Sequence, residues 1–134
     1  MNIDELVDNF ELFDDWEDKY SYIISLGKKL PKMPEELKAK ENKVEGCVSN
    51  VWIVLDIDDK GNLIMQADSD AMIVKGLVFI IYTAINNSKL EDLVDLSLEE
   101  KFKEIGLDEH LSPNRRNGFY SMINKIDAFI KVNT

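Results

Sequence analysis

The chain contains a single cysteine, Cys47, and its neighbours place this thiol where it could react. Gly46 precedes it, and a β-branched and aromatic run that begins at Val51 follows it. Because glycine has no Cβ, the backbone can turn sharply there and a second molecule can approach closely. A thiolate in such a turn is a nucleophile, and with no second cysteine it cannot form an internal disulfide. The alternative is a buried, unreactive cysteine, which is a common role for a free thiol.

The only histidine, His110, is the second candidate for chemistry. A Cys–His pair can form a hydrolytic nucleophile, but nothing in the spacing brings His110 to Cys47, and a packing role in a loop is the simpler interpretation. One cysteine and one histidine fall short of the four ligands of a structural zinc site. We therefore expect no bound metal, and the lack of a glycine-rich phosphate loop argues against a nucleotide cofactor.

Two arginines stand out in this acidic chain. Arg115 and Arg116 fall in the first turn of the predicted last helix, where the helix dipole disfavours a cation. We therefore expect a carboxylate to hold them or a partner to contact them, and Asp68 and Asp70 are candidate partners. The alternative for both aspartates is capping of the long helix that follows them.

The composition favours one compact, soluble domain. The 134 residues are 45% hydrophobic, enough for one core, so we expect a single domain over residues 1–134. A net charge of −10 disfavours binding to nucleic acid and to anionic membranes. The acidic N-terminus lacks the positive start of a signal peptide, and the most apolar stretch is too short to span a membrane. With a lone cysteine, which fits a reducing compartment, these features predict a cytoplasmic protein.

Hydrophobic periodicity predicts helices on both sides of a small sheet. Strands are expected at residues 43–45, 51–55 and 63–67, the last two paired antiparallel across a turn at residues 58–62. Helices are expected at residues 3–10, from Asp14 or Asp15 to Gly27, at 71–86, from the Ser97–Glu100 capping box to Gly106, and after Ser112–Pro113. This order of elements is typical of an α+β fold.

The strand at residues 51–55 is almost continuously apolar. Such a run is typical of a strand that is covered on both faces, so we expect Trp52 to lie in the core. The helix at residues 71–86 is apolar around most of its circumference, which predicts a central, buried position.

Four segments, in order, resemble the SufE-type sulfur acceptors of iron–sulfur cluster assembly. They are DDWEDKYSYIISLGKKLP at residues 14–31, ENKVEGCVSNVW at 41–52, ADSDAMIVKGL at 67–77 and GLDEHLSPNRRNG at 106–118. Together they cover nearly the whole chain. The resemblance implies a small antiparallel sheet of about three strands packed with helices, similar to the IscU-type scaffold fold.

The resemblance also implies a function for the thiol. Cys47 would accept sulfur from the persulfide of a PLP-dependent cysteine desulfurase and deliver it to an iron–sulfur scaffold complex. The protein would then be a sulfur-transfer accessory protein with a covalent persulfide intermediate rather than a free-standing enzyme, acting without a cofactor as a monomer or weak dimer. The supporting residues would be Glu45, Gly46, Ser49, Asp68, Asp70, His110, Arg115 and Arg116.

Two other functions remain open at this point. A non-covalent adaptor would stimulate a desulfurase with Cys47 incidental, and a Cys–His hydrolase would turn over esters or amides without a partner. Because an acidic chain tends to raise the pKa of a thiol, we expect the partner's site, local amides, or Arg115 or Arg116 to help activate Cys47. We also expect the loop to shelter Cys47 against apolar neighbours and to swing out on docking.

Overall fold

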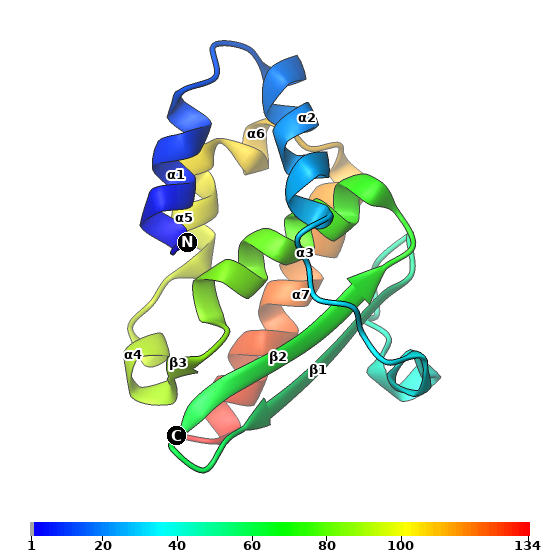
Figure 1. The fold of residues 1–134 in the computed structure, drawn as a ribbon, viewed down its shortest axis with the longest axis vertical. Coiled ribbons are helices and arrows are strands. Elements are labelled where there is room, and N and C mark those ends of the chain that lie inside the picture. The colour runs from blue at the N-terminus through cyan, green and yellow to red at the C-terminus, as the bar shows by residue number, and fades with distance from the viewer. Residues whose placement is uncertain (1) are drawn as a thin grey trace.

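A computed structural model describes residues 2–134, apart from the side chain of Asp108. Three strands form one antiparallel sheet in the order β1-β2-β3, and helices pack around it (Figure 1). The predicted α+β fold is therefore confirmed. The strands are β1 (Val51–Ile57), β2 (Asn62–Ser69) and β3 (Ser88–Lys89), and the helices are α1 (Ile3–Glu11), α2 (Trp16–Gly27), α3 (Met72–Ile85), α4 (Leu90–Val94), α5 (Leu98–Ile105), α6 (Leu107–His110) and α7 (Pro113–Val132). Two short 3-10 helices, η1 (Glu35–Leu37) and η2 (Lys40–Asn42), lie between α2 and β1.

The sheet is built on the predicted hairpin. β1 and β2 pair from Val51 opposite Ser69 to Ile57 opposite Leu63. The third strand is not the predicted one, because residues 43–45 contribute only an isolated bridge from Lys43 to β1. Instead β3 pairs with the start of β2. With only two residues, β3 carries none of the alternation by which a strand is recognised in sequence.

Side-chain caps fix where four of the helices begin, and at the start of α1 the Asn2 side chain accepts a hydrogen bond from the Glu5 N–H at 2.8 Å. Asp15, Ser97 and Ser112 accept hydrogen bonds from backbone N–H groups three residues later, at the starts of α2, α5 and α7. Gly106, with φ +89°, ends α5 in the left-handed conformation that glycine adopts most easily. The predicted starts are thus confirmed, while the short helices α4 and α6 had no predicted counterpart.

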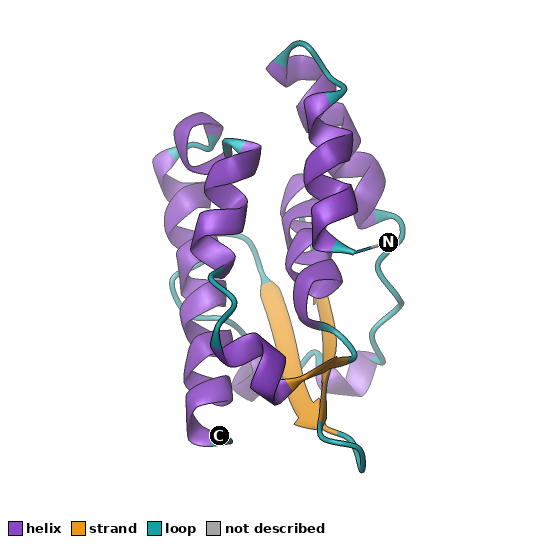
Figure 2. Ribbon diagram, turned by 90° about the vertical axis from the view of Figure 1, so that its left-hand side faces the viewer, coloured by secondary structure: helices purple, strands orange, loops and turns teal. Residues whose placement is uncertain are grey.

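The core is one continuous cluster in which α3 is central. Helices α2 and α3 approach so closely that a Cβ on Gly76 would collide with the carbonyl oxygen of Ile23. The long helix α7 runs lengthwise beside the strands (Figure 2) and adds Phe119, Ile123 and Ile126 to the core. No helix within residues 2–134 combines the length and the apolar character that crossing a bilayer requires.

One face of β1 is less covered than expected. Burial alternates over the first four residues of the strand, with Val51 and Ile53 buried and Trp52 half-buried. The Nζ atom of Lys38 lies over the indole ring, 5.7 Å from its centroid. The expectation that Trp52 is a core residue was wrong, because the ring stays outside the core cluster and packs under a cation from the connector between α2 and β1.

Candidate functional site

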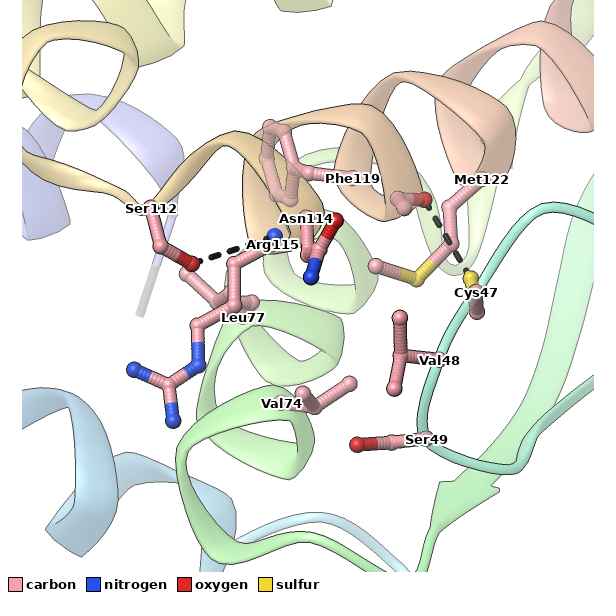
Figure 3. A pocket seen from close by; sticks show the side chains of 11 residues that line it. Cys47, Val48, Ser49, Val74, Leu77, Ser112, Asn114, Arg115, Phe119 and Met122 are labelled. Atoms are coloured by element: carbon pink, nitrogen blue, oxygen red, sulfur yellow. Dashed lines mark hydrogen bonds between the residues drawn. The ribbon is translucent and has the colours of Figure 1, made fainter.

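Cys47 lies in the loop between η2 and β1, directly after a turn formed by Glu45 and Gly46. Gly46 has φ +89°, a conformation in which glycine is strongly favoured. The side chain of Cys47 is half-buried, and its Sγ donates a hydrogen bond to the backbone carbonyl of Gly118 at 3.4 Å (Figure 3). The predicted turn before the strand is confirmed, and it brings the thiol against α7.

Two glycines allow this loop to rest directly on α7. A Cβ on Gly46 would lie 2.6 Å from the hydroxyl oxygen of Ser121, and a Cβ on Gly118 would lie 3.2 Å from the Cys47 Sγ. Both distances are shorter than ordinary van der Waals contact. The thiol therefore occupies space on the helix that any other side chain at position 118 would have to share.

The thiol opens onto a cavity of about 350 Å³ between the loop, α3 and α7 (Figure 3). Its apolar lining comes from α3 and α7, and its polar lining comes from the loop and from the start of α7. Next to the thiol, Val48 is 80% exposed, which is unusual for an aliphatic side chain beside a cavity. The lining residues besides Cys47 and Val48 are Ser49, Val74, Leu77, Ser112, Asn114, Arg115, Gly118, Phe119 and Met122.

The surroundings of Cys47 favour the protonated thiol. Burial raises the pKa of Cys47 above its ordinary value of 9.0, because the negative thiolate loses solvation. The bond to the Gly118 carbonyl needs the thiol proton, so it also favours the neutral form. In Figure 3 the guanidinium of Arg115 lies across the cavity from the sulfur. The expected activation of Cys47 by an arginine is therefore not present in this arrangement.

Both ends of the loop are fixed by hydrogen bonds. The backbone N–H and the side-chain amide of Asn50 donate to the carboxylate of Asp70 at 3.1 and 2.8 Å, and the Ser69 hydroxyl donates to the Asn50 carbonyl at 2.8 Å. On the other side, the Val44 N–H donates to the Val51 carbonyl at 2.8 Å. Asp70 therefore holds the stem of the loop, neither capping α3 nor pairing with an arginine.

Asp68 has different partners from those expected. Its carboxylate pairs with Lys38 at 2.9 Å and with Lys75 at 3.3 Å, and the N-cap position of α3 is Ala71. Burial alone would raise the pKa of Asp68, but hydrogen bonds from Lys38 and from the Ser69 N–H, with the charge of Lys75, outweigh it and lower the pKa. Both the pairing with an arginine and the capping of α3 were wrong predictions for Asp68.

The remaining candidates lie outside the cavity. The imidazole of His110 stacks on the indole of Trp16, with ring centroids 4.0 Å apart. The backbone carbonyl of His110 accepts a hydrogen bond from the Tyr20 hydroxyl. Glu45 is exposed and faces a groove on the other side of the loop. Arg116 is half-buried, and its Nε is a buried atom with no hydrogen-bond partner among the described residues.

The described part of the chain also holds no cluster of three His, Cys, Asp or Glu side chains suited to a metal.

The cavity thus brings together three of the predicted site residues, Cys47, Ser49 and Arg115. Sequence reasoning missed its apolar lining, because Val74, Leu77 and Met122 have the spacing of ordinary core residues. For Gly118, inside the predicted last helix, the sequence left open close packing or a simple cost in helical stability, and the contact with Cys47 confirms the close packing.

The chain is similar to known proteins over nearly its whole length. The family model described as "SufE: Fe-S metabolism associated domain" matches residues 4–130. An uncharacterized SufE-like protein of Rhizobium meliloti is 43% identical over 131 residues, which is 95% of this chain and 93% of that protein. One from Rhizobium etli is 44% identical over 134 residues, covering 98% and 90% respectively.

A solved structure shares the fold. The solution structure of a hypothetical protein from Thermus thermophilus superposes with a TM-score of 0.78, covering 96% of this chain and 93% of that one. The two sequences are 15% identical, so the likeness establishes the arrangement of helices and strands alone.

Proposed function

Because this chain belongs to the SufE family, as its sequence motifs predicted, we propose that it is a sulfur acceptor and carrier. Cys47 takes sulfane sulfur from the persulfide of a PLP-dependent cysteine desulfurase and delivers it to an iron–sulfur scaffold complex. The family itself is associated with Fe–S metabolism. The observation that carries the proposal is that the only thiol of the chain lies on a short turn and opens onto a cavity.

The transfer is an exchange between sulfur atoms. The Cys47 thiolate attacks the outer sulfur of the desulfurase persulfide, and the electron pair of the breaking S–S bond returns to the desulfurase cysteine. The desulfurase leaves as a thiol with the proton that Cys47 lost, and Cys47 becomes the persulfide. No electrons are gained or lost overall, so the reaction needs no oxidant. Having no second cysteine, the chain cannot discharge the sulfur by forming an internal disulfide.

The resting state described above protects the thiol rather than activating it. Because its pKa is raised, Cys47 carries little thiolate at neutral pH, and its sulfur is half-buried against α7. The Cys47 side chain is held by one hydrogen bond, to Gly118, whereas the stems of the loop are held by several. Docking therefore releases the turn at residues 45–49 while the stems stay in place, and the partner's site supplies the charge that favours the thiolate. A reducing, cytoplasmic compartment suits such a thiol.

Mass spectrometry of the intact protein tests the proposal. After incubation with a cysteine desulfurase and L-cysteine, wild-type protein gains one sulfur, located on Cys47 by peptide mapping. Cys47→Ser gains none, and Asn124→Ala, an exposed substitution on α7 outside the cavity, still gains one. If Cys47→Ser stimulates the desulfurase as well as the wild type does and no sulfur adduct forms, the protein is the non-covalent adaptor instead.

A second measurement follows the loop itself. Hydrogen exchange in residues 45–49 should speed up when the desulfurase is added, while exchange in β1 stays unchanged. Unaltered exchange in the loop, at desulfurase concentrations that saturate binding, would contradict the swing of the loop.

A further inference from the structure

The cavity beside Cys47 has two chemically different ends. The thiol lies at one end, and the guanidinium of Arg115 lies across from it (Figure 3). Ser112 and Asn114 add a hydroxyl and an amide to the cavity lining near the start of α7. The sulfur of Cys47 therefore faces the exposed, positively charged side chain of Arg115 across one cavity that is open to solvent.

No described carboxylate balances the charge of Arg115. No carboxylate among the described side chains lies within 4.0 Å of its guanidinium, although the chain has 26 acidic residues. The guanidinium is a planar cation, and its fork of N–H donors matches a carboxylate. The end of the cavity opposite Cys47 is therefore suited to a small anion with the shape of a carboxylate.

The middle of the cavity is apolar and small. Val74, Leu77, Phe119 and Met122 line it between the two ends. Its volume of about 350 Å³ is near the lower limit of the roughly 300–1,000 Å³ typical of small-molecule pockets, which matches a ligand of few atoms. A short aliphatic stem with a carboxylate at one end and a sulfur at the other fits this sequence of surfaces.

We propose that this cavity binds a small thiol that carries a carboxylate, such as free cysteine, and that Cys47 transfers sulfane sulfur to it. The proposal rests on the persulfide of Cys47 proposed above. The carboxylate pairs with Arg115, and the thiol points toward Cys47. The protein thereby gains a second outlet for its sulfur, to a low-molecular-weight carrier instead of a protein scaffold.

The exchange balances without any other reactant. The bound thiolate attacks the outer sulfur of the Cys47 persulfide, the S–S bond breaks, and its electron pair returns to the Cys47 sulfur. The proton released by the small thiol ends on Cys47. The products are the free Cys47 thiol and a small persulfide, and the reverse reaction loads Cys47 from that persulfide.

Discharge of the loaded protein tests the proposal. Wild-type protein is loaded by a desulfurase, purified from it, and mixed with L-cysteine or with cysteamine, which lacks only the carboxylate. Mass spectrometry follows loss of the sulfur adduct. With L-cysteine the rate should saturate with concentration and exceed the cysteamine rate at low concentration by about tenfold, as expected for a charge-assisted bond. The rates at which the same two thiols discharge the loaded protein in denaturant measure their intrinsic reactivities. Each rate for the folded protein is divided by the rate of the same thiol in denaturant.

Two variants locate the effect. Arg115→Gln should abolish the preference for L-cysteine and leave the cysteamine rate unchanged, whereas Lys40→Gln, which removes an exposed charge outside the cavity, should keep the preference. Rates that rise linearly and equally for both thiols in the wild type would overturn the proposal, as would an unchanged preference in Arg115→Gln. Failure of the desulfurase to load Cys47 at all would instead refute the sulfur-carrier function itself.

Discussion

The Sγ of Cys47 and the carbonyl oxygen of Gly118 lie 3.4 Å apart, at a point on α7 where the absent side chain of residue 118 leaves room for the sulfur. This contact joins a reactive group on a loop to the backbone of a long helix 71 positions later in the chain. It holds the thiol in its protonated, half-buried form.

Replacement of Gly118 by alanine should expose Cys47. The new Cβ would lie 3.2 Å from the sulfur, so the loop must move away, while α7 gains up to about 1 kcal/mol of helix propensity. We expect iodoacetamide to alkylate Cys47 several times faster, with the free energy of unfolding unchanged or raised. Asn124→Ala, an exposed substitution on the same helix, is the control and should leave the rate unchanged. Equal alkylation rates in both variants would mean that Gly118 does not set access to the thiol.

The pH dependence of alkylation should report the raised pKa of Cys47. The rate should rise toward a plateau whose midpoint lies above the ordinary thiol value of 9.0, whereas in denaturant the midpoint returns to that value. Because the folded state disfavours the thiolate, its contribution to stability is complete below pH 9 and is lost as the pH rises through the higher folded value. Urea titrations of wild type and Cys47→Ser should therefore diverge above pH 9. A folded midpoint below 9 would contradict the burial argument.

Removal of the Asp68 charge should destabilise the connector that leads to the loop. Asp68→Asn takes the carboxylate away from Lys75 and leaves Lys38 with only the exposed Glu35, and we expect a loss of about 1–3 kcal/mol in urea unfolding. Since the pKa of Asp68 is lowered, this stability is present above the unfolded value near 3.8 and is lost as the pH falls through the folded value. The control is Glu35→Gln, which removes an exposed partner of Lys38 and should cost less than about 1 kcal/mol. Equal losses in the two variants would contradict a special role for Asp68.

The contact between α2 and α3 should tolerate no side chain at residue 76. In Gly76→Ala, the new methyl group meets the carbonyl of Ile23, a backbone group that cannot rotate away. We expect a loss of more than about 3 kcal/mol in the free energy of unfolding, measured in urea. Gly61→Ala has open space around its Cβ, so it should lose only the roughly 1 kcal/mol that its φ of +82° implies. A Gly76→Ala protein as stable as Gly61→Ala would show that the helices can separate freely.

Signals confined to a few neighbouring residues predicted the structure well. Each helix boundary at Ser97, Ser112 and Gly106 depends on groups within four positions in the chain. The local sequence is therefore sufficient to locate these boundaries. The hairpin of β1 and β2 follows in the same way from two apolar runs and a short polar turn.

Contacts between distant segments were not predictable in this way. The partners of Asp68 come from the residue directly after η1 and from α3, and the cation over Trp52 comes from the connector between α2 and β1. Neither contact follows from the residues beside Asp68 or Trp52 in the sequence. Charge alone suggested arginines for Asp68, whereas the fold brings lysines to it. The cavity likewise exists only after α3, α7 and the loop have met, although its nucleophile was evident from composition.

The 71-residue separation between Cys47 and Gly118 also matters during protein synthesis. At about 5–20 residues per second, a ribosome needs several seconds to make the intervening segment. Throughout that interval the nascent chain has no α7 on which the sulfur can rest. Newly made molecules therefore pass through a stage in which this cysteine meets cellular oxidants and electrophiles unshielded, and its protection begins only when translation has delivered the helix.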